Sequence, residues 1–336
     1  MALVTTSSFS ILVNGSPSEI FFPSRGLTEG DPLSPFLFIL MMEGLGRSIK
    51  HAKAMGKIKG LQLSENGQAL THQQSVDDTM LREIPKVNEA SAYNQTVKEF
   101  AMATGMEVNL SKSKIFFLNT NISIQRNISR ILGFQRDSLP TKYLGIPLTA
   151  RPMHKSIWES MLNKLQDKVK NWTFRVLNLV GRLVLTKAVL QSILVFMLSA
   201  LPTPKGVLEK FISIQRYFLW GKEETKKKWA LVSWDKICKP KRQGGLGLDD
   251  QEILNKVLGA KIWWRRVQEP KAQWARIWKE KYANSWHTKD LIRMSGNVKG
   301  SHIWNRAWDN RSLVQNNSFS EIRVRDLALF WEDRWQ

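Results

Sequence analysis

The stretch THQQSVDDTMLRE, residues 71–83, places two adjacent acids, Asp77 and Asp78, between short segments that resemble strands. Two neighbouring carboxylates in a turn are typical of either the solvated tip of a hairpin or a site for a divalent cation. The solvated tip is the commoner arrangement, and the pair alone does not decide between the two. What this hairpin does has to be inferred from the segments around it.

The segments around this hairpin predict a mixed domain of strands and helices. SFSILVNGSPSEIFF has two apolar runs around Asn14-Gly15, a dipeptide typical of tight hairpins. SPFLFILMMEGL is predicted to begin a helix that Ser34 caps. A second helix is expected over about 88–104, with a strand after it. This order of strands and helices indicates an α+β domain over residues 1–148.

Beyond that domain the pattern becomes helical, and all 14 tryptophans lie at or beyond Trp158. Apolar residues at helical spacing predict a helical region over 149–220, and a basic, tryptophan-rich helical region is expected over 221–336. The most apolar run, residues 188–201, is only 14 residues long and includes Gln191. We therefore expect a buried core helix there and no membrane span.

Composition excludes several classes of protein. The chain has 336 residues and one cysteine, Cys238, so it contains neither a disulfide framework nor a cysteine-rich zinc module, and a reducing compartment is favoured. The five histidines are scattered without the spacing of metal ligands. Because the N-terminus lacks the pattern of a secretory signal, a nuclear or cytoplasmic location is expected, without secretion.

The charge balance predicts an acidic polymer as partner. The 50 Lys and Arg residues exceed the 29 Asp and Glu by 21, and most of this excess lies in the second half of the chain. There, AKIWWRRVQEPKAQWARIWKEKY interleaves tryptophans with basic residues, a pattern that can hold single-stranded nucleic acid. We favour a core position for most of these tryptophans. The candidate backbone-contacting residues are Arg265, Arg266, Arg276, Lys279 and Lys281.

Four segments in order resemble the palm motifs of reverse transcriptases, most closely those of plant LINE-type (non-LTR) retrotransposons. They are SRGLTEGDPLSPFLF at 24–38, SVDDT at 75–79, GMEVNLSKSK at 105–114 and LPTKYLGIPL at 139–148. The likeness continues through FLWG, CKPKRQGGLGL, NKVLGAKIWW and IWKEKY, so it covers nearly the whole chain. It implies a partial polymerase palm, an antiparallel sheet with helices, followed by an all-helical thumb and a basic helical C-terminal region.

The resemblance also implies roles for single residues. Asp77 and Asp78 would bind Mg²⁺ or Mn²⁺, and Lys112 would lie near the triphosphate as a charge partner or proton donor. Tyr143 and Gly145 would grip the primer end. The glycine loop would pass under the template and the incoming nucleotide; its candidate residues are Gly26, Gly30, Asp31, Pro32 and Ser34. Plain structural alternatives are an exposed lysine, a core strand and a loop that leads into a helix.

The implied partners are an RNA template, a DNA primer and deoxynucleoside triphosphates, with no membrane. The sequence departs from the family pattern in its carboxylates, because the family takes a third one from a strand before the glycine loop. Residues 1–18 contain no Asp or Glu, and Glu19 is the first acid. We therefore expect a chain that is truncated at its N-terminus and inactive as a polymerase. The alternative is a nucleic-acid-binding remnant without turnover.

Two further departures concern the hairpin and the glycine loop. Polar residues stand where the family has aromatic or apolar ones, and in a buried hairpin each needs a partner or costs on the order of 1–3 kcal/mol. Thr28-Glu29 replaces a common Arg-Gln, and an acid there repels phosphate groups. The polar residues of the hairpin are Gln73, Gln74, Ser75, Arg82 and Glu83.

Overall fold

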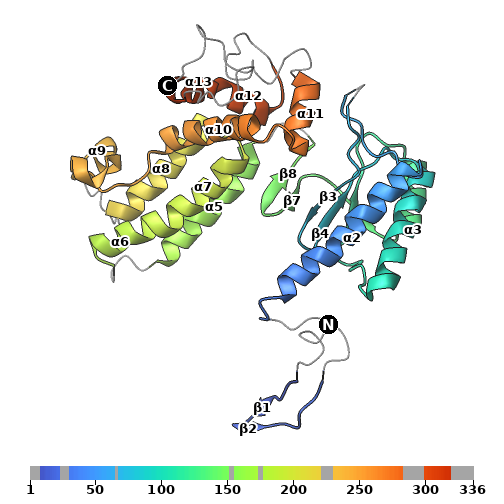
Figure 1. The fold of residues 1–336 in the computed structure, drawn as a ribbon. Coiled ribbons are helices and arrows are strands. Elements are labelled where there is room, and N and C mark those ends of the chain that lie inside the picture. Colours follow the sequence, from blue (N-terminus) through green and yellow to red (C-terminus); the bar gives the residue numbers. More distant parts are fainter. Residues whose placement is uncertain are drawn as a thin grey trace, which may run out of the picture. The chain divides into compact units, whose positions relative to one another are not determined.

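The computed structural model has two compact units, Met1–Ser138 and Leu139–Gln336, each with its own core. Short strands and helices alternate in the first unit and helices dominate the second, which confirms the predicted α+β class (Figure 1). The residues that the structure describes are 8–22, 30–64, 67–150, 155–172, 177–220, 230–282 and 299–318.

In its described residues, the first unit combines three helices with three pairs of short strands. The expected antiparallel sheet is divided into separate two-stranded pieces, and the β5–β6 pair is parallel because α4 connects the two strands as a crossover. The elements are β1 (Leu12–Val13), β2 (Ser16–Pro17), α2 (Ser34–Ala54), β3 (His72–Ser75), β4 (Asp78–Leu81), α3 (Val87–Thr104), β5 (Lys114–Phe116), α4 (Ile122–Leu132) and β6 (Gln135–Asp137).

The core of the first unit lies between α2 and α3, which pack side by side (Figure 1). Leu45 and Ile49, one turn apart on α2, are buried, and Tyr93 of α3 belongs to the same core. The helix expected over 88–104 is confirmed, and it ends at Gly105, whose positive φ of 71° forms the C-cap. This core supports the hairpin of β3 and β4 on α2.

The predicted cap of α2 is wrong. The helix begins at Ser34 itself and Leu33 occupies the N-cap position without a side-chain cap. The turn before it is formed by Asp31, whose Oδ1 accepts a hydrogen bond from the Leu33 N–H at 2.9 Å, and by Gly30 with a φ of +83°. An Asx turn thus takes the place of the expected serine cap.

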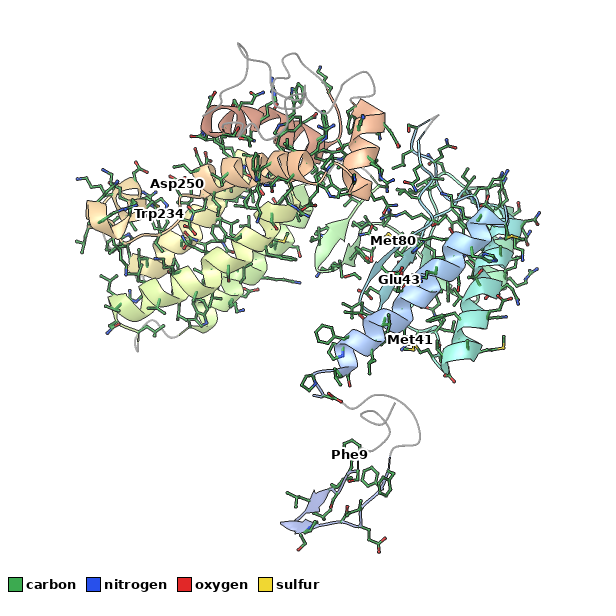
Figure 2. All side chains as sticks on the ribbon, viewed as in Figure 1. Phe9, Met41, Glu43, Met80, Trp234 and Asp250 are labelled. Atoms are coloured by element: carbon green, nitrogen blue, oxygen red, sulfur yellow. The ribbon has the colours of Figure 1, made fainter. Side chains whose placement is uncertain are left out.

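Where the structure describes the second unit, it is helical apart from the β7–β8 hairpin. Figure 2 shows its side chains, with Trp234 of α9 and Asp250 at the start of α10 labelled. The elements are β7 (Thr141–Tyr143), β8 (Ile146–Leu148), α5 (Lys155–Asn171), α6 (Leu179–Leu185), the π-helix η1 (Thr186–Gln191), α7 (Ser192–Ala200), α8 (Lys205–Trp220), α9 (Trp234–Cys238), the 3₁₀ helix η2 (Lys241–Gln243), α10 (Gln251–Gln268), α11 (Gln273–Tyr282), α12 (His302–Asp309) and α13 (Arg311–Asn317).

Besides a buried cluster of Leu219, Trp234, Ile237 and Leu248, two other groupings of aromatic and aliphatic side chains hold the described helices. The larger joins α5, α7 and α8 and includes Leu258 of α10, so the regions expected as thumb and C-terminal part share one core. The smaller is built on Trp263, Trp304 and Trp308, which are at most 3% exposed. The interpretation of Trp263 as a core residue is confirmed.

The continuous helix Leu179–Ala200 is long and apolar enough to cross a membrane by length and composition alone, with 22 residues and a mean hydropathy of 1.9. Core helices pass the same test. Leu190, Leu194 and Leu198 on this helix are at most 1% exposed and belong to the larger core. The expected burial of this apolar run is confirmed for these residues.

Candidate active site

The aspartate hairpin, β3 and β4 over residues 72–81, places both acids at its tip. The strands pair in antiparallel register from His72 with Leu81 to Ser75 with Asp78, leaving Val76 and Asp77 as a two-residue turn. Asp77 lies in the turn, Asp78 begins β4, and both side chains are exposed. The carboxylates are therefore free to meet a ligand in solvent.

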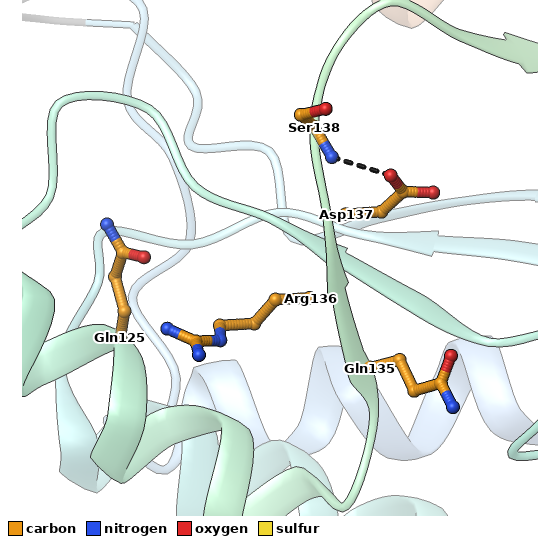
Figure 3. Close-up of a pocket in the computed structure, with 5 residues that line it drawn as sticks. All are labelled: Gln125, Gln135, Arg136, Asp137 and Ser138. Atoms are coloured by element: carbon orange, nitrogen blue, oxygen red, sulfur yellow. Dashed lines mark hydrogen bonds between the residues drawn. The ribbon is translucent and has the colours of Figure 1, made fainter.

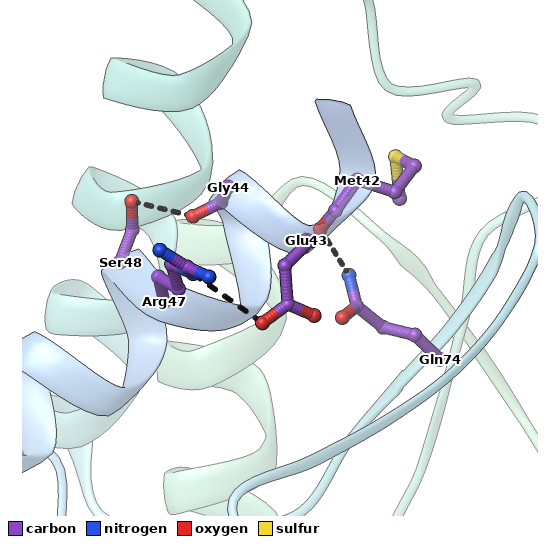
Figure 4. A network of polar contacts seen from close by, with 6 residues as sticks. All are labelled: Met42, Glu43, Gly44, Arg47, Ser48 and Gln74. Carbon is purple, nitrogen blue, oxygen red and sulfur yellow. Dashed lines mark hydrogen bonds and ion pairs between the residues drawn. The ribbon is translucent and has the colours of Figure 1, made fainter. Parts of the chain in front are cut away.

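Three polar residues of the hairpin, Gln73, Gln74 and Arg82, have hydrogen-bond partners. Gln74 Nε2 donates to the Met42 carbonyl of α2 at 3.2 Å, as Figure 4 shows. Arg82 Nη2 donates across the strands to Gln73 Oε1 at 2.6 Å. Gly46 allows the close approach, since a Cβ at that position would lie 2.8 Å from Gln74 Oε1. These polar side chains anchor the hairpin to its helix.

The base of the hairpin is closed by Tyr93, a residue that sequence reasoning missed. Its hydroxyl lies 3.0 Å from the Thr71 carbonyl and 3.1 Å from the Arg82 carbonyl, so it bridges the two chain segments that enter and leave the hairpin. The Arg82 N–H also donates to the Thr71 carbonyl at 2.8 Å. Tyr93 is 1% exposed, which makes this clamp part of the core.

Two glutamates lie beside this tyrosine. Glu89 of α3 is 4% exposed, and its Oε2 accepts hydrogen bonds from the N–H groups of Lys59 and Gly60 at 3.1 and 3.2 Å. Burial, together with the charge of Glu89, raises the pKa of Glu83 to about 7. Burial and both glutamates raise the pKa of Tyr93 as well.

The remaining candidates of the first unit lie in two turns. Gly30, Asp31, Pro32 and Ser34 form the turn that leads into α2, while Gly26 lies outside the described residues. Lys112 follows an Asx turn in which Asn109 Oδ1 accepts hydrogen bonds from Ser111 Oγ at 2.7 Å and from the Lys112 N–H at 3.1 Å. The Lys112 side chain is exposed. The Asn-x-x-Lys spacing thus has a local structural cause.

A polar hollow lies at the end of the parallel β5–β6 pair. It is lined by Gln125 and residues 135–138, and Figure 3 shows the Ser138 N–H donating to Asp137 Oδ1 at 2.8 Å. Lys114 pairs with Asp137 and holds the pKa of that carboxyl below its ordinary value. The carboxylate in this hollow, Asp137 of β6, is already paired with Lys114 of β5. We therefore interpret the hollow as a structural connection between the two strands and not as a ligand site.

Tyr143 and Gly145 belong to the second unit. Tyr143 ends β7, and Gly145 lies in the turn of the β7–β8 hairpin, where Leu144 and Gly145 have φ values of +50° and +76°. A Cβ at Gly145 would lie 3.7 Å from the ring of Phe196. The segment expected to grip the primer is thus a tight hairpin that packs on α7.

Four of the five basic candidates, Arg265, Arg276, Lys279 and Lys281, are exposed. Arg265 also forms an ion pair with Glu269 at 3.1 Å. Arg266 was expected on the surface but is 2% exposed, because its guanidinium lies over the rings of Trp263 and Trp304 at 5.3 and 5.6 Å. Burial lowers the pKa of Arg266 to about 10.

The hairpin carboxylates suit a hard divalent cation, since carboxylate oxygens are the ligands that Mg²⁺ prefers. Asp77 and Asp78 supply two such groups on adjacent residues. Within the part of the chain that the structure describes, no group of three or more His, Cys, Asp or Glu side chains is placed to hold a metal. The donor set is therefore chemically suitable but limited to two side chains.

Comparison with known proteins identifies the class. Residues 2–148 match the family of reverse transcriptases, described as RNA-dependent DNA polymerases, a family that uses divalent metal ions. A segment of 110 residues is 36% identical to an uncharacterized mitochondrial protein of Arabidopsis thaliana, covering 32% of this chain and 88% of that protein. The chain belongs to the reverse transcriptase family.

Two further relatives are longer proteins. An Arabidopsis thaliana protein whose name describes a ribonuclease H protein is 31% identical over 204 residues, which cover 56% of this chain and 31% of that protein. The Pol polyprotein from the type-2 retrotransposable element R2DM of Drosophila melanogaster is 25% identical over 249 residues, or 70% of this chain and 22% of the polyprotein.

The chain thus spans less than a third of the length of either longer relative. The family match and the retrotransposable relative confirm the resemblance on which the sequence interpretation rests. The chain carries the reverse transcriptase domain of a retroelement of the non-LTR kind.

Proposed function

We propose that this chain is the RNA-directed DNA polymerase domain of a LINE-type element, and that its 336 residues alone bind template and primer without extending the primer. The observation that carries the proposal is the aspartate hairpin, whose tip exposes Asp77 and Asp78 within the region that matches the family. Its strands are anchored to α2 by Gln74, so the two carboxylates have a fixed support.

Asp77 and Asp78 would hold Mg²⁺ or Mn²⁺. Bound there, the ion would polarise the phosphate groups of an incoming deoxynucleoside triphosphate. The resemblance implies a third carboxylate before the glycine loop, and the first acid of this chain, Glu19, follows the turn of the β1–β2 hairpin. Two carboxylates bind such ions more weakly than three, which supports a polypeptide that lacks polymerase activity when assayed alone.

Lys112 in the first unit would act as a charge partner of the triphosphate, and Tyr143 and Gly145 in the second would contact the primer end. The exposed basic residues of α10 and α11 would contact phosphates of the RNA template or the DNA primer. They are Arg265, Arg276, Lys279 and Lys281. We also propose a nuclear or cytoplasmic location, on the grounds of the reducing compartment that a single cysteine favours.

Primer extension on an RNA template tests the polymerase claim. The wild-type chain and the Asp77→Asn variant are compared with Mg²⁺ or Mn²⁺, and no template-dependent incorporation is expected from either. Incorporation by the wild type that disappears in Asp77→Asn would refute the inactivity of this chain. It would at the same time establish the role of Asp77.

Salt dependence tests the binding claim. Affinity for a short RNA is expected to fall linearly on a plot of log K against log salt, and Arg276→Gln with Lys279→Gln should reduce the slope by about 2. The matched control is Lys57→Gln with Lys98→Gln, two exposed lysines of the first unit. A slope near zero for the wild type, or equal slopes for both double variants, would contradict the assigned surface.

A further inference from the structure

Two buried acceptor atoms at the base of the aspartate hairpin lack a donor. Glu83 Oε2 and Glu89 Oε1 are both inaccessible to solvent and have no hydrogen-bond partner among the described residues. The other oxygen of Glu89 is occupied by the N–H groups of Lys59 and Gly60. A buried carboxylate oxygen without a donor costs free energy, so the pair requires an explanation.

One proton held between the two carboxyl groups would give both atoms a partner. A protonated Glu83 would supply the hydroxyl donor, and Glu89, which already receives two backbone hydrogen bonds, would supply the acceptor. The charge of Glu89 and burial both favour the neutral form of Glu83, in agreement with its raised pKa. Two carboxyl groups that share one proton are a known consequence of placing two acids in one buried site.

The position of this pair connects it to the hairpin. Glu83 directly follows Arg82, whose carbonyl and N–H both take part in the clamp with Tyr93 and Thr71. Glu89 and Tyr93 lie one helical turn apart on α3, on its buried face. We name Glu83, Glu89 and Tyr93 the base cluster.

We propose that the base cluster holds one proton between its two carboxyl groups and thereby fixes the base of the aspartate hairpin on α3. The three side chains are positioning residues that act through the hairpin backbone. Loss of the proton places two negative charges together in the core. The chain that leaves β4 at Arg82 and Glu83 is then expected to move away from α3, and the clamp opens.

The sign of the pH dependence follows from the raised pKa. The unfolded chain releases the Glu83 proton near the ordinary value for glutamate, 4.5, whereas the folded chain keeps it up to about pH 7. This contribution is fully present below about pH 4.5 and is lost as the pH rises through 7. Tyr93 on α3 interacts with both carboxyl groups, Lys59 donates its backbone N–H to Glu89, and Arg82 directly precedes Glu83 in the chain. The charges that act on His72 of β3 are instead those of Lys50 and Glu43 on α2.

The inference rests on the proposed function in one respect: the position of the hairpin matters because its tip carries the candidate metal ligands. Its test therefore uses amide hydrogen exchange of residues 71–83, which requires no metal, nucleotide or activity. Exchange of the wild type is compared with that of Glu83→Gln at about pH 5.5 and 8.5, so that the intrinsic pH effect cancels. The amide introduced by Glu83→Gln stays neutral at every pH and can donate to Glu89.

The two proteins are expected to exchange alike at the lower pH. At the higher pH the wild type should exchange roughly tenfold faster than Glu83→Gln in this segment, because ionisation of Glu83 favours opening. The matched control is Glu99→Gln, an exposed glutamate of α3 that should follow the wild type at both pH values. Equal exchange of wild type and Glu83→Gln at the higher pH would overturn the proposal.

Two further measurements keep the test decisive if Glu83→Gln folds poorly. Tyr93→Phe should accelerate exchange of residues 71–83 but retain the pH dependence of Glu83. In the wild type, the carboxyl ¹³C signal of Glu83 should titrate near 7. Titration near 4.5 would show that Glu83 does not hold a proton at neutral pH and would overturn the proposal.

Discussion

The two units of this protein are stabilised in different ways. The first carries 14 basic and 12 acidic side chains and holds its hairpin by hydrogen bonds from Gln74, Tyr93 and Arg82. The second carries 36 basic and 17 acidic side chains and holds its helices by buried tryptophan and aliphatic side chains. The positive charge of the chain thus lies almost entirely on the unit with the apolar core.

This difference changes how polar residues should be interpreted. Gln73, Gln74 and Arg82 argue against a buried palm hairpin when the sequence is considered alone, yet each has a partner in the structure. A small unit with a limited core gains the position of its hairpin from directional hydrogen bonds. The second unit has the apolar area to do without them.

The largest effect is expected from Trp304→Ala in the second unit. Trp304 is fully buried and contacts Trp278 at 5.2 Å and Tyr282 at 4.6 Å between ring centroids. The truncation should lower the free energy of unfolding by about 3–5 kcal/mol. Tryptophan fluorescence measures it, since all tryptophans lie in this unit. Trp264→Ala, at an exposed position of α10, is the control and should cost far less.

A smaller loss of unfolding free energy is expected from Arg306→Met. This variant tests a buried polar side chain in the unit that is otherwise held by apolar packing. The Arg306 guanidinium donates to the carbonyls of Leu198, Leu201 and Asn255, and so satisfies the C-terminal end of α7. Removing these donors should cost about 2 kcal/mol. Arg265→Met, which breaks only an exposed ion pair with Glu269, should cost less than about 0.5 kcal/mol. Equal costs would mean that burial of the guanidinium is irrelevant.

The turns of three hairpins differ in their second residue. The first turn residue has a positive φ in each of them, Asn14 at +52°, Val76 at +54° and Leu144 at +50°, and glycine follows Asn14 and Leu144 whereas Asp77 follows Val76. A β-branched residue in this region is strained by on the order of 1 kcal/mol. The strain lies directly beside the candidate metal ligands, where other hydrogen bonds of the hairpin oppose its release.

Val76→Gly should therefore stabilise the turn conformation itself, while it increases the freedom of the unfolded chain. The net change is expected within about 0.5 kcal/mol of zero. Leu144→Gly in the other hairpin is the matched control. Slower amide exchange of residues 75–79 in Val76→Gly would confirm the strain, and faster exchange would show that the valine side chain contributes contacts that outweigh it.

Much of the fold could be predicted from local chemistry. The Asn14-Gly15 hairpin, α2 and α3 follow from turn residues and apolar spacing, and the structure confirms them. Helix α4 is not predicted from the sequence, although Asn121 caps it and Gly133 ends it. The π-helix within Leu179–Ala200 has no local signal of comparable strength.

The candidate site could be predicted only in part. Asp77 and Asp78 are recognisable from the order of motifs, but Tyr93 and Glu89 are not, because their partners are backbone groups more than ten residues away in the chain. Such contacts depend on how α3 packs against the hairpin. An acid at a buried position of a predicted helix was the available signal for Glu89.

A further small effect concerns His72 in the hairpin itself. Burial lowers the pKa of His72, the charge of Lys50 lowers it further, and Glu43 opposes this. Below pH 6.5 the unfolded chain therefore binds more protons than the folded one, and stability should fall as the pH drops. Because the side chain is partly exposed, this loss is expected to stay under about 1 kcal/mol.

His72→Gln should remove this loss as the pH falls from about 6.5 to 5, as measured by amide exchange of the first unit. Glu83 acts in the opposite direction over the same range, so the wild type alone would show a small net change. Glu83 contributes equally to His72→Gln and to the wild type, so its contribution cancels when their pH profiles are compared. In the same way, the contribution of His72 cancels when Glu83→Gln is compared with the wild type. Parallel pH profiles for His72→Gln and the wild type would show that the histidine does not titrate differently in the folded hairpin.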